Sequence, residues 1–322
     1  MYDLALQEQE FKQKIAAYKT ISILTHLNPD ADTLGTALGI YILLRQDKSK
    51  KVEVVNASNA LPRYLDFLPS FSKIKKQMDY SDSLIISCDC GSIDRLGFGL
   101  EGRDIVNIDH HASNTGYGSL NVILPEAASA SEVAYHLLKN IYAPSKDAAT
   151  CFYASLLSDT RYFTTANVDK SVFSLAYDLV NLGANPREIA ANFTQRRALS
   201  SFRILEKALA SLTLYREARV AVLVVSKEEI ASTGASVADM EGIVDYAKSL
   251  VTVEVAIFVM EAEDSLRVSL RSKTVDVSGL ASFFQGGGHK LASGFTLKTA
   301  KVQESIDTIL EHIKNIGLLS EK

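Results

Sequence analysis

The sequence has no tryptophan, only three cysteines, and no apolar run that could span a bilayer. A transmembrane helix needs roughly 18 consecutive apolar residues, whereas the longest candidate run, 38–44, stops at Arg45. The cysteines, at positions 88, 90 and 151, are too few for a disulfide framework and suit a reducing compartment. The first residues carry acids where a signal peptide carries bases. We therefore expect a soluble cytoplasmic protein that does not bind membranes.

An excess of positive charge is also missing. Lys and Arg total 34 against 38 Asp and Glu, a net charge of -4. A long polyanion is bound by a broad basic surface through counterion release, and single-strand channels add aromatic stacking platforms. The composition thus argues against a long nucleic acid as partner, and any nucleic-acid substrate should be short.

The chain is long enough, at 322 residues with 47% apolar content, for two domains with separate cores. In the first half, short β-branched runs alternate with helical patterns, which predicts a parallel sheet with crossover helices. Asp147 is the predicted N-cap of one of these helices, and Gly183 follows the end of another. The predicted strands are 20–25, 52–55, 84–88 and 105–108, and the predicted helices are 33–44, 131–141, 147–158 and 170–182.

The second half has a different pattern of apolar and polar residues. Residues 185–215 are mostly helical in pattern, 219–225 and 253–260 resemble buried strands, and 266–271 alternates strictly. We predict an α/β protein in which an N-terminal parallel-sheet domain, 1–185, is joined by a helical connector, 186–215, to a smaller α+β domain, 216–322.

Aspartates and histidines follow three predicted strands at the point where each strand ends. The carboxyl ends of parallel strands open onto one crevice, so these side chains should converge. A single Asp at such a place is more often a helix N-cap, but a whole set would leave a large negative charge unless cations lay among it. Asp and His suit manganese or magnesium, and a metal pair serves in-line phosphoryl displacement. The residues are His26, Asp30 and Asp32 after the first strand, Asp89 after the third, and Asp109, His110 and His111 after the fourth.

Four segments of the first half resemble the ordered motifs of the DHH phosphoesterase superfamily: HLNPDAD at 26–32, Asp89 in ISCDCGSIDRLG, DHH at 109–111, and Asp159 in LLSDTRYF. In the second half, LRVSLRSKTVDVSGLA followed by GGGHKLASGF looks like the DHHA1 domain that accompanies it. Within the superfamily, the length and layout resemble the oligoribonuclease and pAp phosphatase type. The two domains are then a DHH catalytic domain and a DHHA1 substrate-binding domain.

The resemblance implies a role for each residue of the first half. His26 and Asp30 would bind one divalent cation, Asp32, His110 and Asp159 the other, and Asp89 would bridge them. The cations would be Mn²⁺, with Mg²⁺ or Co²⁺ as alternatives, and a water that they share would be the nucleophile. Asp109 would orient a histidine, and His111 would contact the substrate phosphate or help the leaving oxygen depart.

Substrate-binding residues are expected in the second half. The alternation of 266–271 places Arg267, Ser269 and Arg271 on one strand face, which alone would often be a solvated face. The resemblance implies that Arg271, beside Ser269, binds a phosphate or a base of the substrate. The backbone amides of the glycine run could bind phosphate oxygens at a helix start. That run is Gly286, Gly287, Gly288 and His289. The family commonly has a further glycine at Gln285, which leaves the loop conformation open.

The expected activity is hydrolysis of very short oligoribonucleotides to mononucleotides and of pAp to AMP, with linear or cyclic dinucleotides as further candidates. Three alternatives are an inorganic pyrophosphatase, a single-strand exonuclease and a noncatalytic nucleotide- or RNA-binding protein. Cys88 and Cys90 would both point away from Asp89 as apolar packing residues. The sequence leaves the oligomeric state open, a homodimer included.

Overall fold

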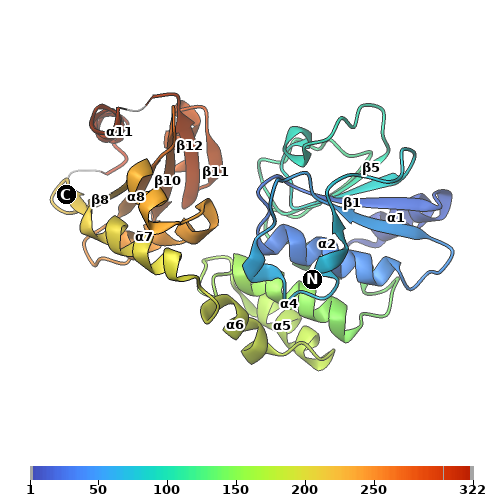
Figure 1. Cartoon of the computed structure of the whole chain (residues 1–322). Helices are drawn as coiled ribbons and strands as arrows, with labels where there is room; N and C mark the ends of the chain where they lie inside the picture. Colours follow the sequence, from blue (N-terminus) through green and yellow to red (C-terminus); the bar gives the residue numbers. More distant parts are fainter. Residues whose placement is uncertain (1–2, 300, 320–322) are drawn as a thin grey trace. The chain divides into compact units, whose positions relative to one another are not determined.

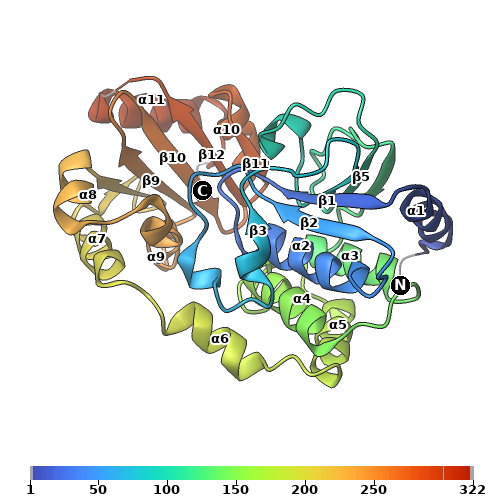
Figure 2. The same ribbon diagram turned by 45° about the vertical axis from the view of Figure 1, so that its right-hand side comes forward.

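The structure is a computed structural model that describes residues 3–299 and 301–319 (Figures 1 and 2). The outermost residues of the two predicted domains, 1–2 and 320–322, lie outside the described residues. The chain divides into two compact units, Met1–Arg196 and Arg197–Lys322, each with its own sheet and core. No described helix has the length and apolarity that crossing a membrane would require.

The first unit is built on a six-stranded parallel sheet in the order β3-β2-β1-β4-β5-β6. The chain runs outward from β1 in one direction and from β4 in the other, so these neighbours form the topological switch point where α/β proteins place their sites. The sheet confirms the predicted fold class and all four predicted strands. The strands are β1 Thr20–Thr25, β2 Lys51–Val55, β3 Ile74–Lys75, β4 Leu84–Cys88, β5 Ile105–Asp109 and β6 Leu120–Ile123.

Helices cover one face of this sheet, as Figure 2 shows for α2, α3 and α4 beneath β1 and β2. The opposite face is covered by a smaller cluster that includes Cys90, Leu96 and Leu100 from the segment after β4. The α-helices of the unit are α1 Ala5–Ala17, α2 Ala31–Leu44, α3 Ala130–Leu138, α4 Lys146–Asp159, α5 Lys170–Asn181 and α6 Pro186–Thr194. Three short 3₁₀ turns are η1 Arg63–Leu65, η2 Phe71–Lys73 and η3 Ile93–Leu96.

Helix α2 lies between the sheet and α4 and is buried on nearly all sides. Two glycines let α2 and α4 approach closely. A Cβ on Gly35 would lie 2.6 Å from the carbonyl oxygen of Cys151, and one on Gly39 would lie 2.3 Å from the ring of Phe152. This close crossing sets the first turn of α2 beside the last turn of α4, where Asp32 and Asp159 lie.

The ends of two helices test the predicted caps. The N-cap of α4 is Ser145, whose hydroxyl accepts a hydrogen bond from the backbone N–H of Ala148. The prediction of Asp147 was therefore wrong, and Asp147 instead lies in the first turn, where the helix dipole favours an acid. Gly183 has φ +104° just past the end of α5, which confirms its predicted capping conformation.

The second unit is built on a mixed sheet in the order β11-β12-β10-β9-β8-β7. Strands β8 and β9 are parallel, and the other neighbours are antiparallel. The strands are β7 Thr213–Tyr215, β8 Val220–Val225, β9 Val255–Glu261, β10 Leu266–Ser272, β11 Gly287–His289 and β12 Ala292–Leu297. The helices are α7 Leu199–Ala210, α8 Lys227–Thr233, η4 Val237–Met240, α9 Ile243–Lys248, α10 Ser278–Phe283 and α11 Val302–Asn315.

Alternate residues of this sheet pack on its two faces. Val222, Ile257 and Val268 join the cluster of α10 and α11, whereas Leu223 and Phe258 join that of α7 and α9. Of the segment predicted as the connector, α6 belongs to the first unit and α7 to the second. The domain boundaries at 185 and 215 stay predictions.

Candidate active site

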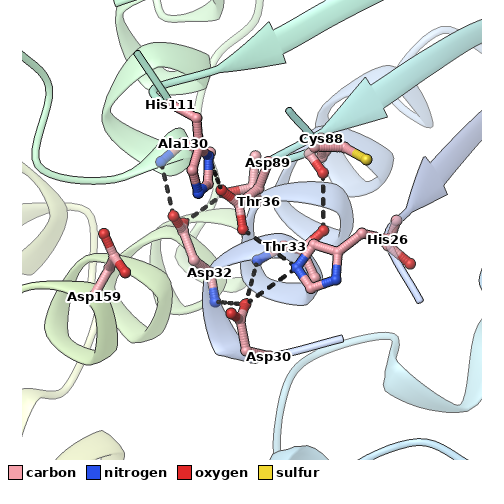
Figure 3. A network of polar contacts seen from close by, with 12 residues as sticks. His26, Asp30, Asp32, Thr33, Thr36, Cys88, Asp89, His111, Ala130 and Asp159 are labelled. Carbon is pink, nitrogen blue, oxygen red and sulfur yellow. Dashed lines mark hydrogen bonds and ion pairs between the residues drawn. The ribbon is translucent and has the colours of Figure 1, made fainter. Parts of the chain in front are cut away.

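The aspartates and histidines of the first unit meet at the carboxyl ends of the central strands. Their ligand atoms form three groups, each within 4.8 Å: His26, Asp30 and Asp89; Asp32, His110 and Asp159; and Asp89, His110 and His111. Figure 3 shows the side chains from β1, α2, β4 and α4 converging on one place. The structure thus brings together all six predicted ligands, with His111 beside them.

Two histidines turn the same nitrogen toward the acids. Nδ1 of His26 lies 2.9 Å from the carbonyl oxygen of Leu27, and Nδ1 of His110 lies 3.1 Å from that of Ala127. A carbonyl oxygen can only accept, so Nδ1 carries the proton in each ring and Nε2 keeps its lone pair. This tautomer, protonated on Nδ1 and fixed by a backbone carbonyl, is the form in which histidine commonly binds a metal through Nε2.

The two imidazole nitrogens face different sets of carboxylates. Nε2 of His26 lies 3.9 Å from Oδ1 of Asp30 and 3.6 Å from Oδ2 of Asp89. Nε2 of His110 lies 3.5 Å from Asp32, 3.6 Å from Asp89 and 3.5 Å from Asp159. These distances are too long for hydrogen bonds and leave space between the ligand atoms.

Asp89 lies between the two sets and presents one oxygen to each. Its residue follows β4 with φ +54°, a conformation that Asp adopts more readily than most residues. The carboxylate is buried, and among the described residues its Oδ1 has no hydrogen-bond donor. Such a buried acceptor is costly unless something else neutralises it, and a cation would do so.

The charges of the cluster also support a cation at this site. Burial, and then the neighbouring charges of Asp32 and Asp30, raise the pKa of Asp89 well above its usual range. The same causes raise the pKa of Asp159, while burial lowers the pKa of His26. Without cations the site therefore disfavours the ionised forms of Asp89 and Asp159, which divalent cations would favour. It also disfavours a protonated His26, and an unprotonated imidazole is the form that binds a metal. The donor set of Asp and His fits Mn²⁺ or Mg²⁺.

Asp30 and Asp32 are held in place by the surrounding helices. Oδ1 of Asp30 accepts from the backbone N–H groups of Asp32 and Thr33, so Asp30 is the N-cap of α2 as well as a candidate ligand. Asp32 accepts from the hydroxyls of Thr36 and Ser155 and, 3.0 Å away, from the backbone N–H of Ala130. Ser155 lies on α4 and Ala130 begins α3, so three helices fix this carboxylate.

Asp109 lies behind the cluster and binds His111. Its Oδ1 lies 2.7 Å from Nδ1 of His111, and its Oδ2 accepts from the amide of Asn114. Burial alone would raise the pKa of Asp109, but the hydrogen bonds from His111 and Asn114 hold it below the usual range. Because Nδ1 of His111 bonds to Asp109, a substrate would have to meet the ring at Nε2.

Cys88 and Cys90 are buried and pack among apolar residues, as predicted, but they do not share one side of the sheet. Cys88 belongs to the core beneath the helices, and Cys90 to the cluster on the opposite face. The period-2 argument was wrong here because the strand ends at Cys88 and the backbone turns at Asp89. Burial raises the pKa of both thiols, which disfavours thiolate ligands.

In the second unit, four of the six predicted substrate residues share one face of neighbouring strands. Arg271 of β10 pairs with Ala292 of β12, which pairs with His289 of β11. In the next row, Ser269 pairs with Gly294, which pairs with Gly287. Directly paired residues point to the same side of a sheet, so an Arg and a His border a strip of small side chains. We call these six residues the substrate strip.

The glycine run differs from its predicted local structure. It follows the end of helix α10 and then pairs with β12, so the predicted position at a helix start was wrong. A Cβ on Gly286 would lie 2.2 Å from the carbonyl oxygen of Gly294, and Gly288 has φ +137°. Gly287, in contrast, has nothing within 4 Å of a built Cβ. Two of the three glycines are thus required by the fold, and the third faces open space.

Gln285 adopts the backbone conformation that a glycine would favour. Its φ is +60°, and the N–H groups of Gln285 and Gly286 bond to the carbonyls of Ser282 and Ala281. This pair of bonds is the Schellman pattern that ends a helix, with Gln285 at the left-handed position. The departure from the family pattern therefore leaves the turn intact.

Comparison with known proteins agrees with both halves of this description. Residues 20–156 match the DHH family, N-terminal domain, and residues 217–316 match the DHHA1 domain. The chain therefore contains a DHH domain followed by a DHHA1 domain. Its DHH domain holds the cluster of acids and histidines, and its DHHA1 domain holds the substrate strip.

Named relatives match this DHH and DHHA1 chain along most of their lengths. A bifunctional oligoribonuclease and PAP phosphatase NrnA of Thermus thermophilus is 28% identical, over 91% of this chain and 89% of the relative. A probable bifunctional oligoribonuclease and PAP phosphatase NrnA of Streptococcus mutans is 29% identical, over 94% and 96%. The crystal structure of an exopolyphosphatase-related protein from Bacteroides fragilis is 24% identical with a TM-score of 0.88, covering 97% of both chains, and shares the fold.

The sequence did not reveal three polar residues of the site: Asn114, Ser155 and Thr36. The only signal for Asn114 is its place three residues after the DHH triplet. Ser155 precedes Asp159 by one helical turn on α4, and Thr36 follows Asp32 by one turn on α2. The i, i+4 spacing could have indicated Thr36 as a support for Asp32. It gives no signal for Ser155, which binds Asp32 from another helix.

Proposed function

We propose that the protein is a manganese-dependent phosphoesterase that hydrolyses very short oligoribonucleotides to mononucleotides and pAp to AMP. The observation that carries the proposal is the position of Asp89, whose two oxygens each lie 3.6 Å from a different imidazole nitrogen. A buried carboxylate between two ligand groups suits a pair of cations that share it. The names of the relatives from Thermus thermophilus and Streptococcus mutans support the choice of substrates.

Two divalent cations would be held by the two sets of ligands that Asp89 joins. When bound, they would lower the pKa of a shared water and neutralise charge on the phosphoryl oxygens. His26 and Asp30 form one set, and Asp32, His110 and Asp159 form the other. The backbone carbonyls behind His26 and His110 keep each Nε2 directed at the acids, so the ligands are oriented before any cation arrives.

Residues of the chain itself complete the proposed reaction. Asp109 accepts the Nδ1 proton of His111. When the ring also carries a proton on Nε2, that proton would be directed at the substrate phosphate or donated to the leaving oxygen. Arg271 and His289 of the substrate strip bind the remainder of the nucleotide. The planar guanidinium of Arg271 suits a phosphate, and the small side chains between the two residues let a base or sugar lie close to the sheet.

The test is a side-by-side assay with Mn²⁺ over pAp, a diribonucleotide, pyrophosphate, a cyclic dinucleotide and a long oligoribonucleotide. The wild type should cleave pAp and the diribonucleotide fastest, and Asp89→Ala should lose at least a hundredfold in turnover while its circular dichroism stays unchanged. Equal turnover in the variant would overturn the assignment of Asp89. Pyrophosphate or the long oligomer as the best substrate would favour the corresponding alternative enzyme, and no product with any divalent ion would favour a noncatalytic binder.

The substrate strip has its own test in Gly287→Ala. Because nothing lies within 4 Å of the added methyl group, the variant should fold normally. We expect the KM for a diribonucleotide to rise about tenfold, since the methyl group occupies the face where the nucleotide would lie. The control is Gly279→Ala, also without neighbours within 4 Å but on α10, which should leave KM unchanged. An unchanged KM in Gly287→Ala would remove the strip from the proposal.

A further inference from the structure

We propose that Asn114 is a positioning residue, whose amide sets the Asp109 carboxylate and, through it, the His111 ring. This inference rests on the proposed function for its catalytic consequence. Asn114 lies in the loop between β5 and β6 and was not among the predicted site residues.

The two oxygens of Asp109 have separate partners. Oδ1 accepts from the backbone N–H groups of His110, at 2.7 Å, and His111, at 3.2 Å, and from Nδ1 of His111. Oδ2 accepts from Nδ2 of Asn114. Asp109 is fully buried, so removal of Asn114 would leave Oδ2 without this donor and free the carboxylate to rotate away from His111.

The amide of Asn114 has only one orientation that satisfies its neighbours. Its Oδ1 accepts from Nδ2 of Asn107, at 2.9 Å, and from the backbone N–H of Gly116, at 2.8 Å. A flipped amide would set donors against these donors, so Nδ2 must face Asp109. The same Nδ2 lies 3.1 Å from the carbonyl oxygen of Cys90, so one amide ties the residue after Asp89 to the DHH triplet.

The consequence concerns His111 rather than the cation ligands. In the proposed reaction, a doubly protonated His111 donates its Nε2 proton to the leaving oxygen as the bond between that oxygen and phosphorus breaks, and the ring keeps the Nδ1 proton that bonds to Asp109. This transfer needs the ring held by Asp109 through Nδ1. In the described part of the chain, Asn114 has no hydrogen bond to His26, Asp30 or Asp32, and these residues keep their own supports.

The first experiment compares Asn114→Ala with Asn121→Ala. Asn121 accepts from the same Asn107, at 3.1 Å, and from Gly118, but has no hydrogen bond to Asp109. We expect Asn114→Ala to lower kcat on a diribonucleotide by about 10- to 100-fold, with KM and the Mn²⁺ affinity changed by less than threefold. Asn121→Ala should change kcat by less than threefold. Equal losses in both variants would show a general effect on the loop and overturn the proposal.

The second experiment asks whether Asn114 acts through His111. Adding Asn114→Ala to His111→Ala should cost no further activity, because residues that act as one unit are not additive. A nitrophenyl ester of a nucleotide has a leaving oxygen that needs no proton, so wild type and Asn114→Ala should cleave it at rates within threefold of each other. Additive losses, or an equal loss on the ester, would contradict a role through His111.

A third measurement does not depend on turnover. With ¹⁵N-labelled histidine, only six in the chain, the proton on Nδ1 of His111 should be visible by NMR in the wild type and in Asn121→Ala, and lost in Asn114→Ala. A signal that persists in Asn114→Ala overturns the inference even if the enzyme is active. If the signal is lost in Asn114→Ala but the wild type cleaves no phosphate ester, the positioning role of Asn114 is supported and the proposed function is wrong.

Discussion

Asp30 shows that one side chain can have two roles that look like alternatives in a sequence. An Asp at the start of a helix is usually explained as an N-cap, and Asp30 does cap α2. Its Oδ1 nevertheless lies 3.9 Å from Nε2 of His26, in one of the candidate ligand groups. The cap fixes the carboxylate where a cation would need it, so the structural role supports the proposed chemical one.

Gln285 gives a prediction at the same scale. A residue with a Cβ is strained in the left-handed conformation by about 1–2 kcal/mol. Glycine removes this strain, but part of the gain is offset because glycine loses more conformational entropy on folding. Gln285→Gly should therefore stabilise the DHHA1 domain by about 0.5–1 kcal/mol. The free energy of opening, from hydrogen exchange of β9 and β10 amides, would measure it. Gln285→Ala keeps the Cβ and should bring no gain; a gain of equal size would show that strain at Gln285 is not the cause.

The candidate ligands could be predicted because their positions depend on local order and one rule of topology. His26, Asp89 and His110 each follow a strand, and parallel strands end at one edge. Thr36 lies one turn after Asp32 on the same helix, so its contact had a local signal, but Asn114 and Ser155 could not be predicted from local order. Which hydroxyl or amide reaches a carboxylate depends on how α2 packs on α4 and how a loop folds back, and no short sequence pattern encodes either.

At the scale of elements, the crossing of α2 and α4 determines whether Asp32 and Asp159 can meet. Gly35→Ala would place a methyl group 2.6 Å from a backbone oxygen of α4, and the helices would have to separate. We expect a loss of about 1–3 kcal/mol in the free energy of unfolding and weaker binding of Mn²⁺, measured by urea denaturation and calorimetry.

The control for this crossing is Gly279→Ala. Gly279 lies in helix α10 without neighbours near a built Cβ, so alanine there should be neutral or slightly stabilising. If Gly35→Ala were as harmless as Gly279→Ala, the close approach of α2 and α4 would not be important for the metal centre.

Elements with strong periodicity were predicted well, and short ones were missed. The four predicted strands of the DHH domain lie in the centre of its sheet, where both faces are buried. β3 and β6 lie at the edges of the sheet, with two and four residues, and half of their positions or more are only partly buried. The glycine run became β11 because β12 offers it an edge to pair with, a long-range condition that the run itself does not show.

At the scale of the whole molecule, the two units have separate cores, and a cation in the DHH domain should stabilise that domain first. The raised pKa values of Asp89 and Asp159 mean that, without cations, protonation favours the folded state. Their stability contribution is complete below the unfolded pKa, near 4, and is lost as the pH rises through the folded pKa. Cations replace these protons, so Mn²⁺ should stabilise more as the pH increases.

Hydrogen exchange would measure this prediction. Mn²⁺ should raise protection in β1, β4 and α2 more at pH 8 than at pH 6, and should leave β9 and β10 nearly unchanged. Asp89→Ala is the control and should show a much smaller response. An equal response at both pH values, or one centred on β9 and β10, would contradict the placement of the cations in the DHH domain.

The spread of the ligands along the chain has a consequence for synthesis on the ribosome. His26 emerges long before Asp159, and the crossover helices and strands of the sheet lie between them. A nascent chain that stops short of α4 lacks Asp159, and it also lacks Ser155 and the helix that packs against Gly35 and Gly39. Loading with metal should therefore follow the emergence of α4, and it need not await the DHHA1 domain.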